Sequence, residues 1–446
     1  MVSGRRLAGR PAQAFVKFAK IPAPFRWRKV GERMSKLARA VRPEAAGTVP
    51  FFEKCYRYED VARVKSTGYY SFFRAIESAQ DPEVTLGSRR LVMLGSNNYL
   101  GLTNDPRVKE AAIEAVRKYG SGCAGSRFLN GTLDLHIRLE ERLAEFMRQE
   151  AAITFSTGFQ VNLGVISCLV GKGDTVYLDK QDHACIIDGA RLSFGDVKKF
   201  KHNDPADLRR QLRNDHESRG RLVVVDGVFS MEGDIAPLPE IVAAAREFAA
   251  GVMVDDAHGI GVLGPTGRGT AEHFDLEQDV DLIMGTFSKS MASVGGFIAG
   301  NARVIQYIQH RARTLIFSAA PPPASVAAAL ATVEIMEREP ERRARLWENT
   351  RFFREGLRSL GFDTGESQSP VVPVVVGEDM NALRMVHLLE EEGVFVNCVL
   401  SPATPPGRAL IRTSLMATHT RAHLARALDA FEKVGREVGL LHAVHV

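Results

Sequence analysis

The sequence predicts an α/β fold with a large domain built on a mostly parallel central sheet and a smaller α+β C-terminal domain. Short β-rich runs alternate with helical segments between about residues 105 and 300. Beyond about residue 340 the pattern changes to long helices with a few strands. Polar residues follow several of the β-rich runs, at the sheet edge where parallel α/β proteins bind ligands.

The apolar periodicity sets the expected elements in chain order. The expected helices include 106–119, 134–148, a segment from 158 to about 169, and 238–249. The expected strands of the large domain are 151–157, 175–179, 221–230, 251–258, 281–289 and 296–300. Those of the small domain are 371–376, 394–400 and 409–415. We divide the chain into an extension (1–48), a connecting segment (49–104), a large domain (105–340) and a small domain (341–446).

The positive charge of the chain belongs to its first residues. Residues 1–44 contain twelve Lys and Arg and two acids, a net +10, whereas the whole chain of 446 residues carries +5. The aromatic residues among these basic ones are typical of a segment that lies on an anionic membrane surface, and a solvated extension explains them equally well. No apolar stretch follows the early arginines, so a secretory signal is not expected. Nucleic-acid binding is disfavoured because the body offers no second basic surface.

Composition excludes several classes of protein. A hydrophobic content of 45% and a charged content of 25% are those of a globular chain. The five cysteines form no C-x-x-C pair, so neither a disulfide framework nor a metal site is expected. Scattered cysteines fit a reducing compartment, and we therefore expect a cytoplasmic location. The longest uncharged stretch, 314–333, contains three consecutive prolines, which argues against a membrane-spanning helix.

One glycine motif is misleading. Residues 259–264 match G-x-G-x-x-G after a strand, but a dinucleotide site needs a helix to begin within the glycines. Residues 265–269 (PTGRG) indicate a loop instead, so we do not interpret the motif as a dinucleotide site.

Three residues at strand ends suggest a reactive centre. Lys289 would face the ligand crevice, where its amine could form a Schiff base, although a lone lysine is more often a surface charge. Asp255 ends a buried strand and needs a cationic partner, either a pyridinium nitrogen or an arginine. His258 could bond a phenolate oxygen or be a core histidine.

Further groups lie at the same edge. Thr157, Gly158 and Phe159 open a helix whose free amides could bind phosphate together with Thr286 and Ser288, although a plain N-cap explains the same residues. His183 could cover a planar ring or cap the next helix, and Ser230 ends the strand of 221–230. An amine, a carboxylate, a phosphate site and a ring-stacking group match the needs of pyridoxal 5'-phosphate (PLP).

The chain resembles the α-oxoamine synthase family, fold-type I PLP enzymes that condense an amino acid with an acyl-CoA and release CO₂. The resemblance spans about residues 50–435, and it rests on these motifs: GSNNYLGL (95–102), GSRFLNGT (125–132), FSTGFQVNLG (155–164), DHACIIDG (182–189), DGVFSMEGDIAPL (226–238), VDDAHGIGVLGPTGRG (254–269), GTFSKSMASVGGF (285–297), FSAAPPP (317–323) and RTSLMATHT (412–420). Asp226 departs from the glutamate usual in the family.

The resemblance implies roles for individual residues. Lys289 would form the Schiff base and move the Cα proton, Asp255 would pair with the pyridinium, and His258 would bond the ring hydroxyl. His183 would stack on the ring and act in catalysis. Arg412 and Asn97 would hold the substrate carboxylate. The remaining cofactor contacts would come from Thr157, Gly158, Phe159, Ser230, Thr286, Ser288 and, across a homodimer interface, Ser318 and Ala319.

Within the family, the sequence is most similar to members that join L-serine to palmitoyl-CoA, giving 3-oxosphinganine, CoA and CO₂. The alternatives are members that use L-alanine and a pimeloyl thioester, and 2-amino-3-oxobutyrate CoA ligase. A catalytically silent, membrane-associated subunit is a third alternative, against which the presence of Lys289 argues. For the lipid-like substrate, we expect residues 1–44 to provide peripheral contact with the inner membrane face.

Overall fold

The computed structural model describes residues 49–441, which fall into two units, 49–64 and 65–441. The first unit contains a 3₁₀ turn η1 (Pro50–Phe52) and a short helix α2 (Glu53–Tyr56). Helix α3 (Asp60–Ser66) runs across the division between the units. None of these three elements contains a buried residue.

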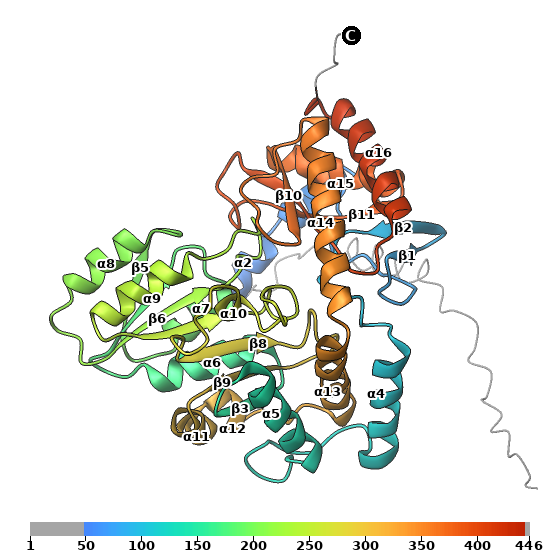
Figure 1. The fold of residues 1–446 in the computed structure, drawn as a ribbon. Coiled ribbons are helices and arrows are strands. Elements are labelled where there is room, and N and C mark those ends of the chain that lie inside the picture. The colour runs from blue at the N-terminus through green and yellow to red at the C-terminus, as the bar shows by residue number, and fades with distance from the viewer. Residues whose placement is uncertain (1–48, 442–446) are drawn as a thin grey trace, which may run out of the picture. The chain divides into compact units, whose positions relative to one another are not determined.

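A seven-stranded sheet forms the centre of the second unit (Figure 1). Its strands, in spatial order, are β3 (Ala151–Phe155), β9 (Gly296–Gly300), β8 (Leu282–Thr286), β7 (Gly251–Asp255), β6 (Arg221–Asp226), β4 (Thr175–Asp179) and β5 (Asp196–Phe200). The five strands from β8 to β5 are parallel, and β9 runs antiparallel to both of its neighbours. The predicted α/β fold with a mostly parallel sheet is therefore confirmed.

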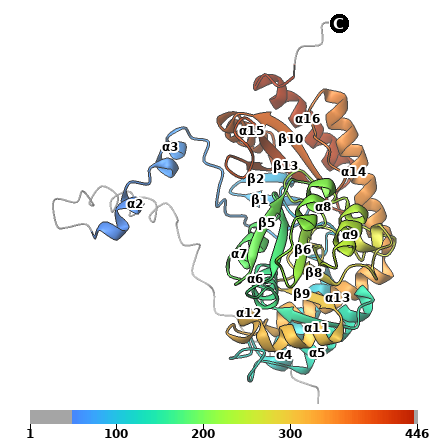
Figure 2. The ribbon, with the colours of Figure 1, turned by 90° about the vertical axis from the view of Figure 1, so that its left-hand side faces the viewer.

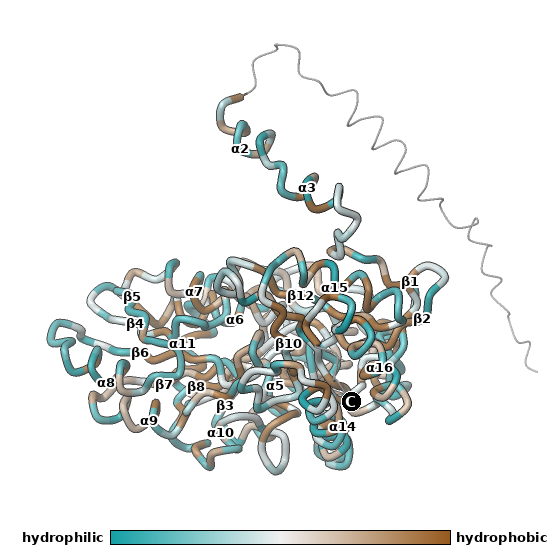
Figure 3. Tube along the Cα trace, turned by 90° about the horizontal axis from the view of Figure 1, so that it is seen from above, coloured by the Kyte–Doolittle hydropathy of each residue, from teal (hydrophilic) through white to brown (hydrophobic). Residues whose placement is uncertain are grey.

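Both faces of this sheet are buried, which explains why its strands are continuous apolar runs. Successive side chains point to opposite faces, so Val223 and Val225 enter one hydrophobic cluster while Val224 enters the other. Val252 and Met253 divide in the same way. Figure 3 shows hydrophobic colouring along the central strands and hydrophilic colouring over the outer turns.

Helices cover the two faces. The helices of the large domain are α4 (Pro106–Tyr119), α5 (Asp134–Met147), α6 (Gly158–Leu169), α7 (Ala184–Arg191), α8 (Pro205–Arg213), α9 (Leu238–Glu247), α10 (Thr270–His273), α11 (Ala302–Arg311), α12 (Arg313–Ile316) and α13 (Pro323–Arg338). Apolar side chains of α6, α7 and α11 join one cluster, and those of α5, α8 and α9 join the other. Helices α4 and α13 lie side by side (Figure 1).

Two small three-stranded sheets accompany the C-terminal helices. One has the order β1 (Glu83–Leu86), β2 (Arg89–Met93), β11 (Val394–Phe395), and the other β10 (Val371–Gly377), β13 (Ala409–Ser414), β12 (Asn397–Val399). Helices α14 (Pro340–Leu360), α15 (Asp379–Glu391) and α16 (Arg421–Glu437) gather beside them (Figure 2). The domain boundaries at 104 and 340 stay predictions.

The single strand expected over 394–400 is wrong. The chain instead divides at Val396, so that β11 pairs in parallel with β2 whereas β12 pairs antiparallel with β13. A continuous apolar run cannot reveal this change of sheet, because its pairing partners lie far away in the sequence. Strand β5 was not expected either, since its sequence DVKKF is largely polar and it lies at the sheet edge.

The basic segment of residues 1–44 lies outside the described residues. Within 49–441, no helix is both long enough and apolar enough to cross a bilayer.

Candidate active site

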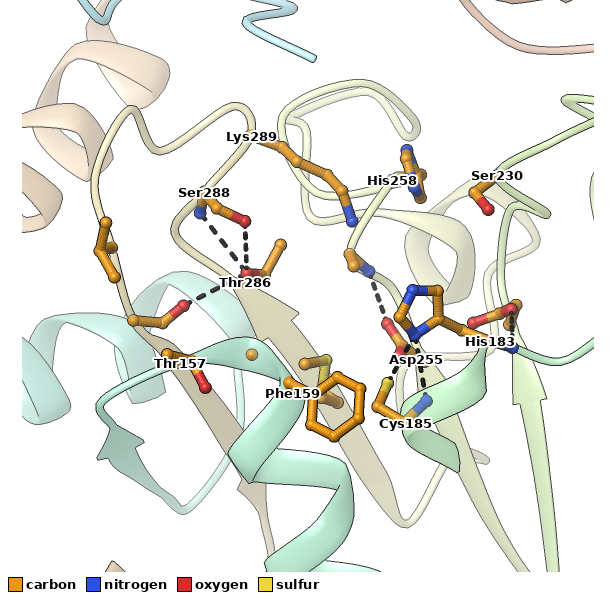
Figure 4. Close-up of a pocket in the computed structure, with 16 residues that line it drawn as sticks. Thr157, Phe159, His183, Cys185, Ser230, Asp255, His258, Thr286, Ser288 and Lys289 are labelled. Carbon is orange, nitrogen blue, oxygen red and sulfur yellow. Dashed lines mark hydrogen bonds between the residues drawn. The ribbon is translucent and has the colours of Figure 1, made fainter. Parts of the chain in front are cut away.

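A cavity of about 350 Å³ lies in the second unit, at the carboxyl ends of the parallel strands (Figure 4). Ten of the fourteen predicted site residues line it: Thr157, Gly158, Phe159, His183, Ser230, Asp255, His258, Thr286, Ser288 and Lys289. The other four, Asn97, Arg412, Ser318 and Ala319, do not. Six lining residues were not predicted: Cys185, Asp226, Ala257, Met284, Val294 and Gly295.

Lys289 enters the cavity from the turn that follows β8 (Figure 4). Burial lowers the pKa of its amine, and the negative charge of Asp255 acts in the opposite direction. No hydrogen bond or ion pair joins the amine to another residue within 49–441. A desolvated amine with a lowered pKa is more often neutral, which is the form that attacks a carbonyl.

Asp255 is the last residue of β7 and is only 4% exposed. Its carboxylate accepts hydrogen bonds from Asn162 Nδ2 at 2.6 Å and from the Ala257 amide at 3.0 Å. The arginine salt bridge considered as the alternative is absent among the described residues. Its partners on the protein are thus neutral donors, which leaves the charge of this buried carboxylate without a fixed cation.

Asn162 is a site residue that the sequence did not single out. It lies fully buried on α6, and its Nδ2 also contacts the sulfur of Cys185 at 3.0 Å. The available signal was a polar amide between Val161 and Leu163 in a mostly apolar helix, since a buried polar group requires a partner.

His183 caps the helix that follows it, and its ring also lines the cavity. It is the N-cap of α7, where its Nδ1 accepts from the Cys185 amide at 3.3 Å, and its ring lines the cavity. The ring of Phe159 meets it edge-on with centroids 6.4 Å apart. Burial lowers the pKa of His183. The Asp226 carboxylate accepts from the His183 amide at 2.8 Å and so fixes the start of the helix.

His258 is buried and lines the cavity. Its Nδ1 lies 2.7 Å from the phenol oxygen of Tyr99. Burial lowers its pKa well below the usual range. His258 is therefore a neutral imidazole.

The start of α6 could hold an anion, and we refer to it as the anion site. Thr157 caps the helix by accepting from the Gln160 amide at 3.2 Å, and the hydroxyls of Thr286 and Ser288 lie 3.0 Å apart beside it. Gly158 has no room for a side chain, because a Cβ would lie 2.6 Å from Thr286 Oγ1. The start of the helix can therefore pack closely against Thr286, and its amides attract negative charge.

Arg412 and Asn97 contact each other, whereas their role in holding a substrate carboxylate stays a prediction. Arg412 Nη1 donates to Asn97 Oδ1 at 3.0 Å and to Ser414 Oγ at 2.9 Å, while Nε donates to the backbone oxygen of Ser230. These bonds hold the guanidinium next to Ser230, which lines the cavity. Ser318 and Ala319 lie next to the anion site but do not line the cavity. Ser318 Oγ accepts from Gln160 Nε2 at 3.0 Å.

The glycine run of 259–264 is a series of turns, and the next helix, α10, begins only at Thr270. Its interpretation as a loop is confirmed. The glycines make room for a neighbouring carboxylate, since a Cβ at Gly259 would lie 1.9 Å from Asp256 Oδ1.

The cavity fits PLP on its own chemistry. It offers an amine for the aldehyde, a buried carboxylate without a cation for the ring nitrogen, a neutral imidazole for the ring oxygen and a helix start for the phosphate. Fold and site together define a PLP-dependent enzyme of fold type I.

Residues 89–431 match the family described as aminotransferase class I and II, and the chain belongs to that family. A serine palmitoyltransferase of Sphingobacterium spiritivorum is 52% identical over 86% of this chain and 96% of its own length. A solved structure of SPT with PLP is 39% identical, with a TM-score of 0.85 over 89% of this chain and all of the other. An 8-amino-7-oxononanoate synthase of Symbiobacterium thermophilum is 47% identical over 86% of this chain and 98% of its own length. Both activities belong to the α-oxoamine synthases, so the predicted resemblance is confirmed.

Proposed function

We propose that this protein is a serine palmitoyltransferase, which condenses L-serine with palmitoyl-CoA to form 3-oxosphinganine, CoA and CO₂, the first step of sphingolipid synthesis. The observation that carries the proposal is that a desolvated Lys289 amine and the buried Asp255 carboxylate line the same cavity, in a chain 52% identical to a serine palmitoyltransferase.

PLP is the cofactor, and when bound it supplies an electron sink for negative charge at the amino-acid Cα. Asp255 would hold the ring nitrogen protonated, His258 would bond the ring oxygen, and Thr157, Thr286 and Ser288 would receive the phosphate. His183 would cover the ring. The amide of Asn162 keeps the Asp255 carboxylate in one orientation.

Lys289 would hold the cofactor through its aldehyde, and the same amine is placed to move the proton at the substrate Cα. Its lowered pKa favours this role, because burial leaves more of the amine in the neutral form that can accept a proton. Arg412 and Asn97 hold the substrate carboxylate, which keeps CO₂ from leaving before the acyl-CoA arrives.

We expect Arg412→Ala to weaken L-serine binding by about 10–100-fold, the usual loss for a charge-assisted hydrogen-bond pair, with a much smaller change in the KM for palmitoyl-CoA. Spectral titration and steady-state kinetics measure the two. Arg408→Ala, which removes an exposed arginine just before β13, is the control. Equal losses for both substrates would count against a carboxylate clamp.

The choice of substrate is tested by titrating the PLP-loaded protein with L-serine, L-alanine and glycine, followed by acyl-CoA assays of increasing chain length. We expect a spectral response and turnover with L-serine and palmitoyl-CoA. A preference for L-alanine with pimeloyl-CoA would assign the 8-amino-7-oxononanoate synthase activity instead, which the relative at 47% identity supports.

The active form is a homodimer in this proposal, and Ser318 and Ala319 contact the phosphate of the partner site. Support comes from their position against Gln160 and Ser156, next to the anion site but outside the cavity of their own chain. Sedimentation of the loaded protein tests the dimer, and a monomer with full activity would refute it.

The protein works in the cytoplasm and contacts the inner membrane face through residues 1–44. The support is their charge of +10 and their aromatic residues. Deleting residues 1–44 is expected to abolish binding to anionic liposomes, which should weaken steeply with salt in the full chain. Binding that is insensitive to salt or unchanged by the deletion would refute this location.

A further inference from the structure

Tyr99 lies beside the cavity without lining it. It belongs to the segment between β2 and α4, is 1% exposed, and places its phenol oxygen 2.7 Å from His258 Nδ1. The two rings meet at 65° with centroids 6.0 Å apart. His258 thus presents one ring nitrogen to Tyr99 and leaves the other, Nε2, for the cavity that it lines.

Both partners are uncharged. Burial raises the pKa of Tyr99, which keeps its proton although the Arg412 charge acts in the opposite direction. His258 is neutral for the reason given above and carries a single N–H. A phenol is a better donor than a neutral imidazole N–H, and the bare imidazole nitrogen is a better acceptor than a phenol oxygen.

Arg412 strengthens this assignment. The guanidinium is close enough to shift the pKa of Tyr99 and can only donate hydrogen bonds. A phenol oxygen that faces a donor-only group on one side directs its own proton to the acceptor on the other side. The Ser414 hydroxyl also contacts the phenol oxygen, but its oxygen already accepts from Arg412 Nη1 at 2.9 Å, so it can donate its own proton to the phenol. The acceptor of the phenol proton is then His258 Nδ1.

We propose that Tyr99 is a positioning residue that holds His258 as the Nε2–H tautomer, so that an N–H donor points into the cavity toward a cofactor oxygen. The role of that donor rests on the proposed function, whereas the tautomer rests on the Tyr99 contact. Without the phenol, Nδ1 would lose its buried partner, and the imidazole would be free to carry its proton on either nitrogen.

The first test uses the cofactor-free protein. Side-chain ¹⁵N spectra of the histidines, with His258 assigned by its loss in His258→Gln, are expected to show a bare Nδ1 and a protonated Nε2. In Tyr99→Phe the two shifts should move toward those of a tautomer mixture. A protonated Nδ1 in the original protein, or an unchanged tautomer in Tyr99→Phe, would overturn the proposal.

Tyr177→Phe is the matched control. Tyr177 is also fully buried, and its hydroxyl bonds Asp215, away from the cavity. This variant also loses a buried phenol hydroxyl, so it reports the general structural cost of that loss. We expect it to leave the His258 signals unchanged, and a change as large as that in Tyr99→Phe would contradict a specific role for Tyr99.

The second test uses PLP itself. Tyr99→Phe is expected to weaken PLP binding by about 10-fold, the size of the hydrogen bond from His258 Nε2–H to a charged cofactor oxygen. It should also shift the pH midpoint of the bound cofactor's absorbance. Both effects should vanish in the His258→Gln background, because the phenol acts through the imidazole. Effects of the same size in that background would refute this route. If the original protein does not bind PLP, the proposed function fails while the ¹⁵N result still decides the tautomer.

Discussion

Lys289→Ala is expected to abolish turnover, with a loss of at least about 10³-fold, and to remove the visible absorbance of the bound cofactor. In the proposed mechanism, the substitution removes both the amine that would bind the aldehyde and the base that would take the Cα proton. No second lysine lines the cavity within the described residues, so no other amine can substitute for it. Absorbance and single-turnover assays of the PLP-loaded protein measure the two losses.

Lys180→Ala is the matched control for this prediction. Lys180 follows β4 at the same edge of the sheet but is exposed and does not line the cavity. We expect near-normal absorbance and activity in this variant. A Lys289→Ala protein that keeps the visible band would contradict the assignment of the amine.

Asp255→Asn is expected to lower kcat by about 10²–10³-fold, the scale of losing one well-placed electrostatic group. The asparagine keeps the volume of the side chain but removes the charge that holds the ring nitrogen protonated. Cofactor affinity should fall as well, because the other groups that contact residue 255, from Asn162 and Ala257, are neutral and cannot replace the lost negative charge. Kinetics and PLP titration provide the measurements.

Asp256→Asn separates this effect from the general cost of altering a buried acid. Asp256 is fully buried next to Asp255, but it bonds the amide and hydroxyl of Thr270 and does not line the cavity. Burial raises the pKa of its carboxyl to about 7. We expect this variant to lose stability while its PLP absorbance persists. The same kinetic loss in both variants would argue against a specific role for Asp255.

The sequence was most informative where chemistry follows directly from local pattern. Apolar runs identified six strands of the central sheet, and the polar residues after them, such as Asp255 and Lys289, could be placed at one edge. This works because parallel strands bring their carboxyl ends together regardless of how far apart they lie in the chain. The family motifs then connected those residues with PLP.

Contacts between distant segments could not be predicted in this way. Asn162 reaches Asp255 across 93 residues, and Tyr99 reaches His258 across 159, so neither pairing leaves a local pattern. The division of the run 394–400 between two sheets has the same cause, because β11 pairs with a strand about 300 residues earlier. Asp226 was also missed as a lining residue, because it is the last residue of β6 whereas the predicted strand continued to residue 230.

The most direct measurement is borohydride reduction of the PLP-loaded protein followed by peptide mapping. The proposed mechanism predicts a single stable cofactor adduct on the peptide that contains Lys289, together with loss of the visible band. A protein that stays colourless with PLP, or that carries the adduct on another lysine, would contradict it.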